Sequence, residues 1–168
     1  AKAIRERDKT GTVVMISNES CSSYNRPMLT KTMLASLTAE QIAEPLDFGS
    51  VDVSFISLKL ILPALRGLLK PQGQVVCLVK PQFEAGREKV GKKGVVRDPE
   101  VHLEVLEQFL IHASDAGFSV KDMDFSPIKG PEGNIEYLMF VQKSGEPSVL
   151  DDSVAEQVVA ASHSTLDR

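Results

Sequence analysis

Short apolar runs alternate along this sequence with longer stretches in which apolar and polar residues share a helical period. Runs rich in branched aliphatic residues predict strands over residues 12–16, 51–56 and 74–79. The last of these, Gln-Val-Val-Cys-Leu-Val, is apolar on both faces, which is typical of a central parallel strand. Two more strands are expected over residues 118–125 and 135–141. Because the connection between them is too short for a crossover helix, we expect these two to pair antiparallel.

The segments between the strands carry the signals of helices. The clearest helix starts at Asp98, an N-cap residue followed by Pro99 at the first helical position, and it ends before Gly117. A single apolar stripe runs along it. Further helical segments are expected over residues 1–9, 32–44, 58–69 and 152–165. Polar residues predominate over 17–31 and 80–97, which we expect to be loops.

This order of elements predicts an α/β protein. Strands that alternate with helices form a mostly parallel sheet with helices on both faces, and the final pair adds a terminal antiparallel hairpin at one edge. The expected architecture is therefore Rossmann-like. Because the chain starts at Ala1, directly in helical sequence, we expect it to be a piece of a longer protein. Residues 1–143 are expected to form a partial domain, followed by a linker and a C-terminal helix over 144–168.

The composition excludes several classes of protein. A hydrophobic fraction of 42% and a charged fraction of 25% are those of a globular domain. No apolar run reaches the roughly 18 residues of a membrane span, and no signal peptide is recognisable, so we expect a cytoplasmic protein without a membrane partner. The net charge of −4 argues against a protein that coats nucleic acid by bulk attraction, but it allows a local basic surface.

The cysteines and histidines do not predict a disulfide or a metal site. Cys21 and Cys77 lack a paired spacing, and Cys77 lies in an apolar strand, so a reduced core thiol is expected. His102, His112 and His163 show no metal-ligand spacing with cysteines or carboxylates. His102 and His112 are expected on the surface of their helix.

Three charged residues are expected to meet at one edge of the sheet. Ligands of open α/β sheets bind beyond the carboxyl ends of the parallel strands. Asp52 lies in or near the end of its predicted strand, and Lys80 directly follows the next strand. The antiparallel last strand starts at the same edge, with Glu136 at its beginning. A lysine held between two carboxylates suits the deprotonation of a weak acid such as a hydroxyl, although the carboxylates also favour the charged lysine.

Each of these residues also has an ordinary structural interpretation. Asp52 could cap a helix, Lys80 could be a solvated lysine at a strand end, and Glu136 could be an exposed strand residue. Taken one at a time, these interpretations are the more common ones. Taken together with the motifs that contain them, a shared catalytic site is the favoured hypothesis.

The segments around these residues carry a family resemblance. Residues 52–58 (Asp-Val-Ser-Phe-Ile-Ser-Leu), residues 80–99, which begin Lys-Pro-Gln-Phe-Glu-Ala-Gly-Arg-Glu-Lys-Val, and residues 126–136 resemble the haemolysin-A-type, TlyA-like ribosomal RNA 2′-O-methyltransferases. These enzymes are related to the FtsJ/RrmJ group. The resemblance is strong over residues 50–142, and the run that begins at Lys80 is highly specific.

The resemblance implies a function, a cofactor and a set of site residues. It implies a sheet of the S-adenosylmethionine-dependent methyltransferase type, and transfer of a methyl group to a ribose 2′-hydroxyl of ribosomal RNA or of ribosomal subunits. Asp52, Lys80 and Glu136 take the last three places of a Lys-Asp-Lys-Glu catalytic set. Asp52 is also expected to contact S-adenosylmethionine, together with Asn18.

The family also has parts that this chain lacks. An amino-terminal S4-like RNA-binding domain, a glycine-rich cofactor loop and the first catalytic lysine are expected upstream of it. We therefore expect an incomplete fold without its first strands, in which residues 51–56 form an exposed apolar edge. The alternative to an enzyme is a non-catalytic fragment or remnant that keeps only the fold and the RNA contact. A Rossmann oxidoreductase is disfavoured because the G-x-G-x-x-G fingerprint is missing.

The segment over residues 80–97 is the candidate for RNA contact. It is locally basic within an acidic chain, and its glycines would let the backbone approach a phosphate. An aromatic residue in it could stack on an unpaired base. The alternative is a solvated loop whose phenylalanine folds back onto the core. The residues expected to bind RNA are Phe83, Arg87, Lys89, Lys92, Lys93 and Arg97.

Overall fold

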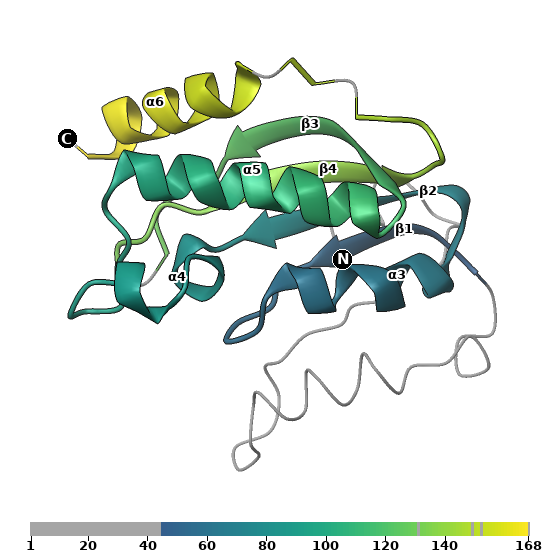
Figure 1. Ribbon diagram of the computed structural model, residues 1–168, viewed down its shortest axis with the longest axis horizontal. Helices are drawn as coiled ribbons and strands as arrows, with labels where there is room; N and C mark the ends of the chain where they lie inside the picture. Colours follow the sequence, from purple (N-terminus) through teal and green to yellow (C-terminus); the bar gives the residue numbers. More distant parts are fainter. Residues whose placement is uncertain (1–44, 131, 149, 152, 168) are drawn as a thin grey trace, which may run out of the picture.

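A computed structural model describes residues 45–130, 132–148, 150–151 and 153–167 of the chain (Figure 1). The elements predicted before residue 45, and the cofactor contact predicted at Asn18, lie outside the described residues. The described part is a four-stranded sheet with helices packed against it, which confirms the α/β class. No helix in this part is long and apolar enough to cross a membrane.

The strand order is β1-β2-β4-β3. β1 and β2 pair parallel, whereas β4 pairs antiparallel with both β2 and β3, so three strands run in one direction and β4 in the other. The predicted antiparallel pairing of the last two strands is confirmed, and their hairpin forms one edge of the sheet. The strands are β1 Leu46–Val51, β2 Leu69–Val79, β3 Phe118–Phe125 and β4 Tyr137–Lys143.

In sequence, most of the helical elements lie between strands that run in the same direction. The helical elements are η1 Leu58–Leu60, α3 Leu62–Leu68, α4 Pro81–Glu84, η2 Arg87–Lys89, α5 Pro99–Asp115 and α6 Val154–Leu166. Figure 1 shows α5 in front of the sheet with α6 packed beside it. The predicted start of α5 is confirmed, since Asp98 Oδ1 accepts a hydrogen bond from Glu100 N at 3.0 Å. Gly117, with φ +75°, follows its end.

The predicted strand over residues 51–56 is wrong, because β1 ends at Val51. The residues that follow form a loop in which Val53 and Ile56 still point into the core, with only 6% and 8% of their surface exposed. Apolar and polar residues alternate from Val51 to Phe55 as they do in a strand, but Phe55 has φ +63°, which is not a strand conformation. The expected exposed apolar edge over 51–56 is therefore also wrong. The two edge strands of the described sheet are β1 and β3.

Two further boundaries differ from the prediction. The expected helix over 58–69 is divided into η1 and α3 and ends at Leu68. β2 starts at Leu69 and continues through Pro71 and Gly73, because Leu69 pairs with Leu46 of β1. The segment over 80–97, expected to be a loop throughout, contains the short helices α4 and η2.

A single hydrophobic cluster lies between the sheet and its helices. It includes Val75, Cys77 and Val79 of the central strand β2, each fully buried. Helix α6 contributes Ala155 and Val159 to the same cluster. Cys77 is a free thiol, and burial raises its pKa to about 12, which confirms the predicted reduced core cysteine.

Candidate active site

Asp52 and Lys80 meet at the carboxyl ends of neighbouring parallel strands. Each is the first residue after its strand, β1 or β2. Lys80 Nζ lies 2.6 Å from Asp52 Oδ1 and donates a hydrogen bond to Ser54 Oγ at 3.3 Å. The Lys80 side chain is 13% exposed, whereas that of Asp52 is 66% exposed. The lysine is thus held inside the edge of the sheet by a carboxylate that faces solvent.

Glu136 reaches the same edge from the antiparallel strand. The ladder between β2 and β4 ends at the pair Val79–Tyr137, so Lys80 and Glu136 are the next residues on the two strands. Glu136 is buried, and its Oε1 accepts a hydrogen bond from Gln82 Nε2 at 3.3 Å. Among the described contacts, Glu136 thus binds Gln82, whereas the Lys80 ammonium binds Asp52 and Ser54.

The sequence did not indicate a role for Glu84, which follows Lys80 on the short helix α4. Glu84 ends the short helix α4 and accepts hydrogen bonds from Ser57 Oγ at 2.6 Å and Leu58 N at 2.8 Å. Burial raises the pKa of Glu84, and the hydrogen bonds from Ser57 and Leu58 oppose that shift. The only signal for it in the sequence was its place in the specific run that starts at Lys80.

The same two segments also bring two aromatic rings into contact. The ring centroids of Phe55 and Phe83 are 4.8 Å apart, and the planes are tilted by 48°. Phe55 remains 60% exposed even though it contacts Phe83. Phe83, which is half-buried, thus contacts a second, exposed ring, and its contact with RNA stays a prediction.

The basic segment that follows is held at its far end by Asn134. Asn134 Oδ1 accepts a hydrogen bond from Val96 N at 3.0 Å, and Asn134 Nδ2 donates to Gly94 O at 2.9 Å. Gly94 has φ +72°, which a residue with a side chain rarely adopts. Of the predicted RNA contacts, Lys89 forms an ion pair with Glu104 of α5. Those that lie exposed are Arg87, Lys92, Lys93 and Arg97.

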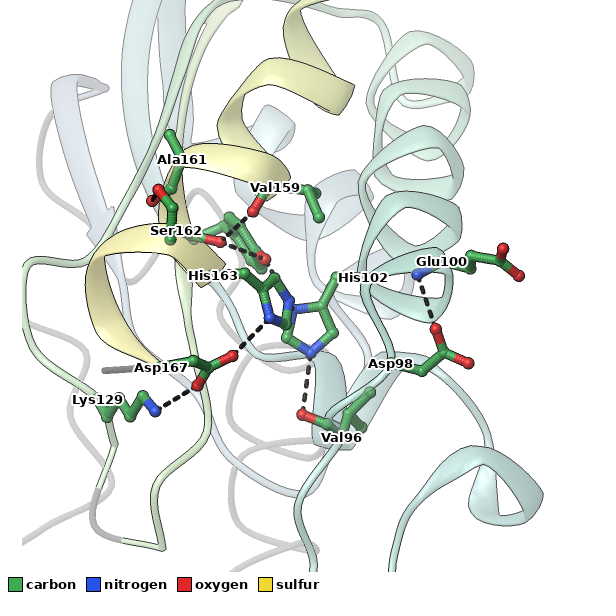
Figure 2. Close-up of polar contacts among 12 residues, drawn as sticks. Val96, Asp98, Glu100, His102, Lys129, Val159, Ala161, Ser162, His163 and Asp167 are labelled. Carbon is green, nitrogen blue, oxygen red and sulfur yellow. Dashed lines mark hydrogen bonds and ion pairs between the residues drawn. The ribbon is translucent and has the colours of Figure 1, made fainter.

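His102 belongs to a buried network, so its expected place on the helix surface is wrong. It is completely buried, its Nδ1 lies 2.7 Å from Tyr137 Oη, and its Nε2 lies 3.0 Å from Val96 O (Figure 2). Because a carbonyl oxygen only accepts, Nε2 carries the hydrogen and Nδ1 accepts from the tyrosine. Burial lowers the pKa of His102, in agreement with this neutral form.

The network continues into α6 and into the segment before β4. His163 Nε2 lies 3.3 Å from His102 Nδ1, and His163 Nδ1 lies 2.7 Å from Asp167 Oδ2. Asp167 also pairs with Lys129 at 2.6 Å. Figure 2 shows these side chains as one chain of contacts between α5, α6 and the segment that contains Lys129. Tyr137, at its centre, directly follows Glu136, so α6 is connected to the charged edge of the sheet.

The described residues contain no candidate site for a metal ion. No group of three or more histidines, cysteines, aspartates or glutamates in this part of the chain could hold a metal ion. Asp52 is the one predicted cofactor contact within the described range, and its exposed carboxylate lies at the carboxyl edge of the parallel strands. The fold and this charged cluster define an α/β protein of the class whose ligands generally bind beyond the carboxyl ends of the strands.

Comparison with known proteins identifies the family. The FtsJ-like methyltransferase family matches residues 8–143, and the chain belongs to this family. It is 50% identical over 123 residues to YqxC of Bacillus subtilis, a candidate rRNA methyltransferase, and this match covers 71% of the chain and 44% of YqxC. It is 36% identical over 131 residues to the 16S/23S rRNA (cytidine-2′-O)-methyltransferase TlyA of Mycobacterium tuberculosis, over 76% of the chain and 49% of TlyA.

Solved structures agree with this assignment. A candidate haemolysin from Streptococcus thermophilus superposes with a TM-score of 0.76 at 48% identity, over 80% of this chain and 49% of that one. A candidate haemolysin from Lactococcus lactis gives a TM-score of 0.71 at 45% identity, over 76% of this chain and 61% of that one. The resemblance and the methyltransferase type of fold expected from the sequence are thereby confirmed. The chain spans about half the length of the curated relatives it matches.

Proposed function

We propose that this chain belongs to an S-adenosylmethionine-dependent enzyme that methylates a ribose 2′-hydroxyl of ribosomal RNA. The observation that carries the proposal is the Lys80–Asp52 ion pair at the carboxyl ends of two adjacent parallel strands, with Lys80 largely buried. The names of the TlyA relatives support the choice of ribosomal RNA as substrate. The name of the TlyA relative, a (cytidine-2′-O)-methyltransferase, supports the ribose 2′-hydroxyl as the acceptor of the methyl group.

In this mechanism, Lys80 takes or polarises the proton of the ribose hydroxyl. A hydroxyl is a weak nucleophile near neutral pH, so a positioned proton acceptor increases the rate of its attack. Asp52 and Ser54 hold the Lys80 nitrogen at the edge of the sheet. Glu136, which accepts a hydrogen bond from Gln82, directly precedes the neighbouring strand β4, where its carboxylate would orient the lysine or the hydroxyl.

S-adenosylmethionine fits the donor set at this edge. Its sulfonium and amino groups are cationic, and Asp52 presents an exposed carboxylate at the carboxyl ends of the strands. When bound, the cofactor supplies an electrophilic methyl group to the activated hydroxyl. The proposed partner of Asp52 in this contact, Asn18, lies outside the described residues.

RNA would lie along the basic segment and the aromatic pair. Arg87, Lys92, Lys93 and Arg97 extend from the charged edge and are exposed, which suits contact with phosphates. Phe55 and Phe83 belong to the two segments that also carry Ser54 and Lys80, and the exposed Phe55 ring would stack on an unpaired base. Such a base would bring its ribose next to the proposed proton acceptor.

The test of catalysis is transfer of a labelled methyl group to ribosomal RNA. Lys80→Ala should reduce transfer by about 10²-fold or more, the usual contribution of a general base. Lys70→Ala is a matched control, because Lys70 forms an ion pair with Asp47 near the opposite ends of the same two strands. Full activity in Lys80→Ala would refute the role of the lysine. A wild-type chain that transfers no methyl group would favour the non-catalytic remnant instead.

The test of RNA contact is the salt dependence of binding. Reversal of charge at Lys92 and Lys93 removes two phosphate contacts, which should reduce the slope of log affinity against log salt by about 1.4 for single-stranded RNA. Lys59→Glu is the control, because Lys59 is exposed next to His112 of α5 and lies outside the basic segment. An unchanged slope in the double variant would contradict the proposed RNA surface.

A further inference from the structure

Glu84 connects two segments that are far apart in the sequence by hydrogen bonds. Its two carboxylate oxygens accept hydrogen bonds from Ser57 Oγ and from Leu58 N, 27 and 26 residues away. Ser57 ends the loop that follows β1, and Glu84 ends the helix that starts directly after Lys80. The carboxylate therefore ties the far end of the β1 loop to the helix next to the lysine.

The near end of the same loop is held by the lysine itself. Lys80 contacts Asp52 and Ser54, and the ring of Phe83 contacts the ring of Phe55. Contacts thus follow the same order along both segments, from the lysine through the aromatic pair to the glutamate. The loop keeps this course although Phe55 adopts a positive φ, which is unfavourable for a residue with a bulky side chain.

We propose that Glu84 is a positioning residue, which holds the loop over residues 52–57 so that Asp52 and Ser54 remain on the Lys80 ammonium. This inference rests on the proposed function, in which Lys80 takes the proton of the ribose hydroxyl. Burial disfavours the charged form of Glu84, and an apolar side chain could fill the same space without that cost. The two hydrogen bonds to the loop give the carboxylate a specific role.

The experiment measures how fast Lys80 reacts with acetic anhydride, by mass spectrometry of the whole 168-residue chain. Exposed Lys93 in the same molecule is the internal reference. Glu84→Ala should increase the relative rate at Lys80 several-fold, because the freed loop no longer covers the ammonium. Glu84→Gln should restore nearly the wild-type rate, since an amide can accept from Leu58 N and donate to Ser57 Oγ. Glu107→Ala, an exposed glutamate of α5, should leave the rate unchanged.

Ser57→Ala keeps the test decisive if Glu84→Ala does not fold. It removes one of the two hydrogen bonds to Glu84 and should increase labelling of Lys80 by a smaller factor in the same direction. Unchanged labelling in folded Glu84→Ala or in Ser57→Ala would overturn the proposal, as would equal labelling in the Gln and Ala variants.

A methyl-transfer assay provides a second, independent measurement on the same variants. Glu84→Ala should lower kcat, because the residue acts through Lys80, and should also raise KM for RNA, because the freed loop carries Phe55 of the proposed base-stacking pair. The labelling rate does not depend on catalysis. A chain that methylates no RNA but shows the labelling change would therefore refute the proposed function and leave the positioning role of Glu84 intact.

Discussion

Tyr137→Phe should test whether the buried network stabilises the fold. The substitution removes one hydroxyl and keeps the ring, which is completely buried. In the wild-type protein this hydroxyl lies 2.7 Å from His102 Nδ1 and 3.1 Å from Ser162 Oγ. Burial raises the pKa of Tyr137 to about 12, so the hydroxyl is neutral and donates its hydrogen at ordinary pH.

The size of the effect follows from what each partner loses. Ser162 Oγ still donates to Val159 O at 2.8 Å, so it remains satisfied as a donor. His102 Nδ1 loses its close donor, and His163 Nε2 at 3.3 Å can replace it only when His163 is protonated, because the Nδ1 of His163 already donates to Asp167. A buried group left without its partner costs about 1–3 kcal/mol. Because some compensation remains, we expect a decrease of about 1–2 kcal/mol in the free energy of unfolding.

The assay is urea unfolding followed by far-UV circular dichroism, because the chain contains no tryptophan. The midpoint should decrease at an unchanged m value. In a His102→Ala background the same substitution should cost less, since the acceptor is already absent. An unchanged midpoint in Tyr137→Phe, or an equal loss in both backgrounds, would refute the described pairing of tyrosine and histidine.

Other consequences of the structure can be measured by the same unfolding assay. Because burial lowers the pKa of His102, the unfolded chain takes up a proton at a higher pH than the folded protein does, so the free energy of unfolding should decrease as the pH falls below about 6.5. His102→Gln should weaken this pH dependence, and an identical pH profile in the variant would contradict the assignment to His102. Gly117→Ala should cost about 1–2 kcal/mol, since φ is +75° and the new Cβ would lie 2.5 Å from Arg66 Nε. Gly145→Ala should lower the free energy of unfolding much less, because the new Cβ would lie in open space. Equal losses of stability in the two variants would refute the role assigned to the backbone and to Arg66 at Gly117. Asp98→Ala should lower the free energy of unfolding by about 0.5–2 kcal/mol, because α5 loses its N-cap, whereas Asp98→Ser should keep most of the capping stabilisation.

Much of the architecture could be read from local pattern. The N-cap and proline at Asp98 and Pro99 marked the start of α5, and the apolar run over 74–79 marked the central strand. The meeting of Asp52 and Lys80 was also predictable, because the carboxyl ends of adjacent parallel strands necessarily lie at one edge. These features depend on residues close in sequence, or on the direction of strands.

Features that depend on contacts between distant segments could not be read in this way. The end of β1 was misplaced because Val51, Val53 and Phe55 alternate with polar residues as in a strand, whereas Val53 is in fact buried by the tertiary packing of a loop. His102 looked like a surface residue because its partners, Tyr137 and His163, lie 35 and 61 residues away. A polar side chain becomes tolerable in the core only when such partners satisfy it. Periodicity therefore indicated which elements form, and the packed structure decided which polar groups are buried together.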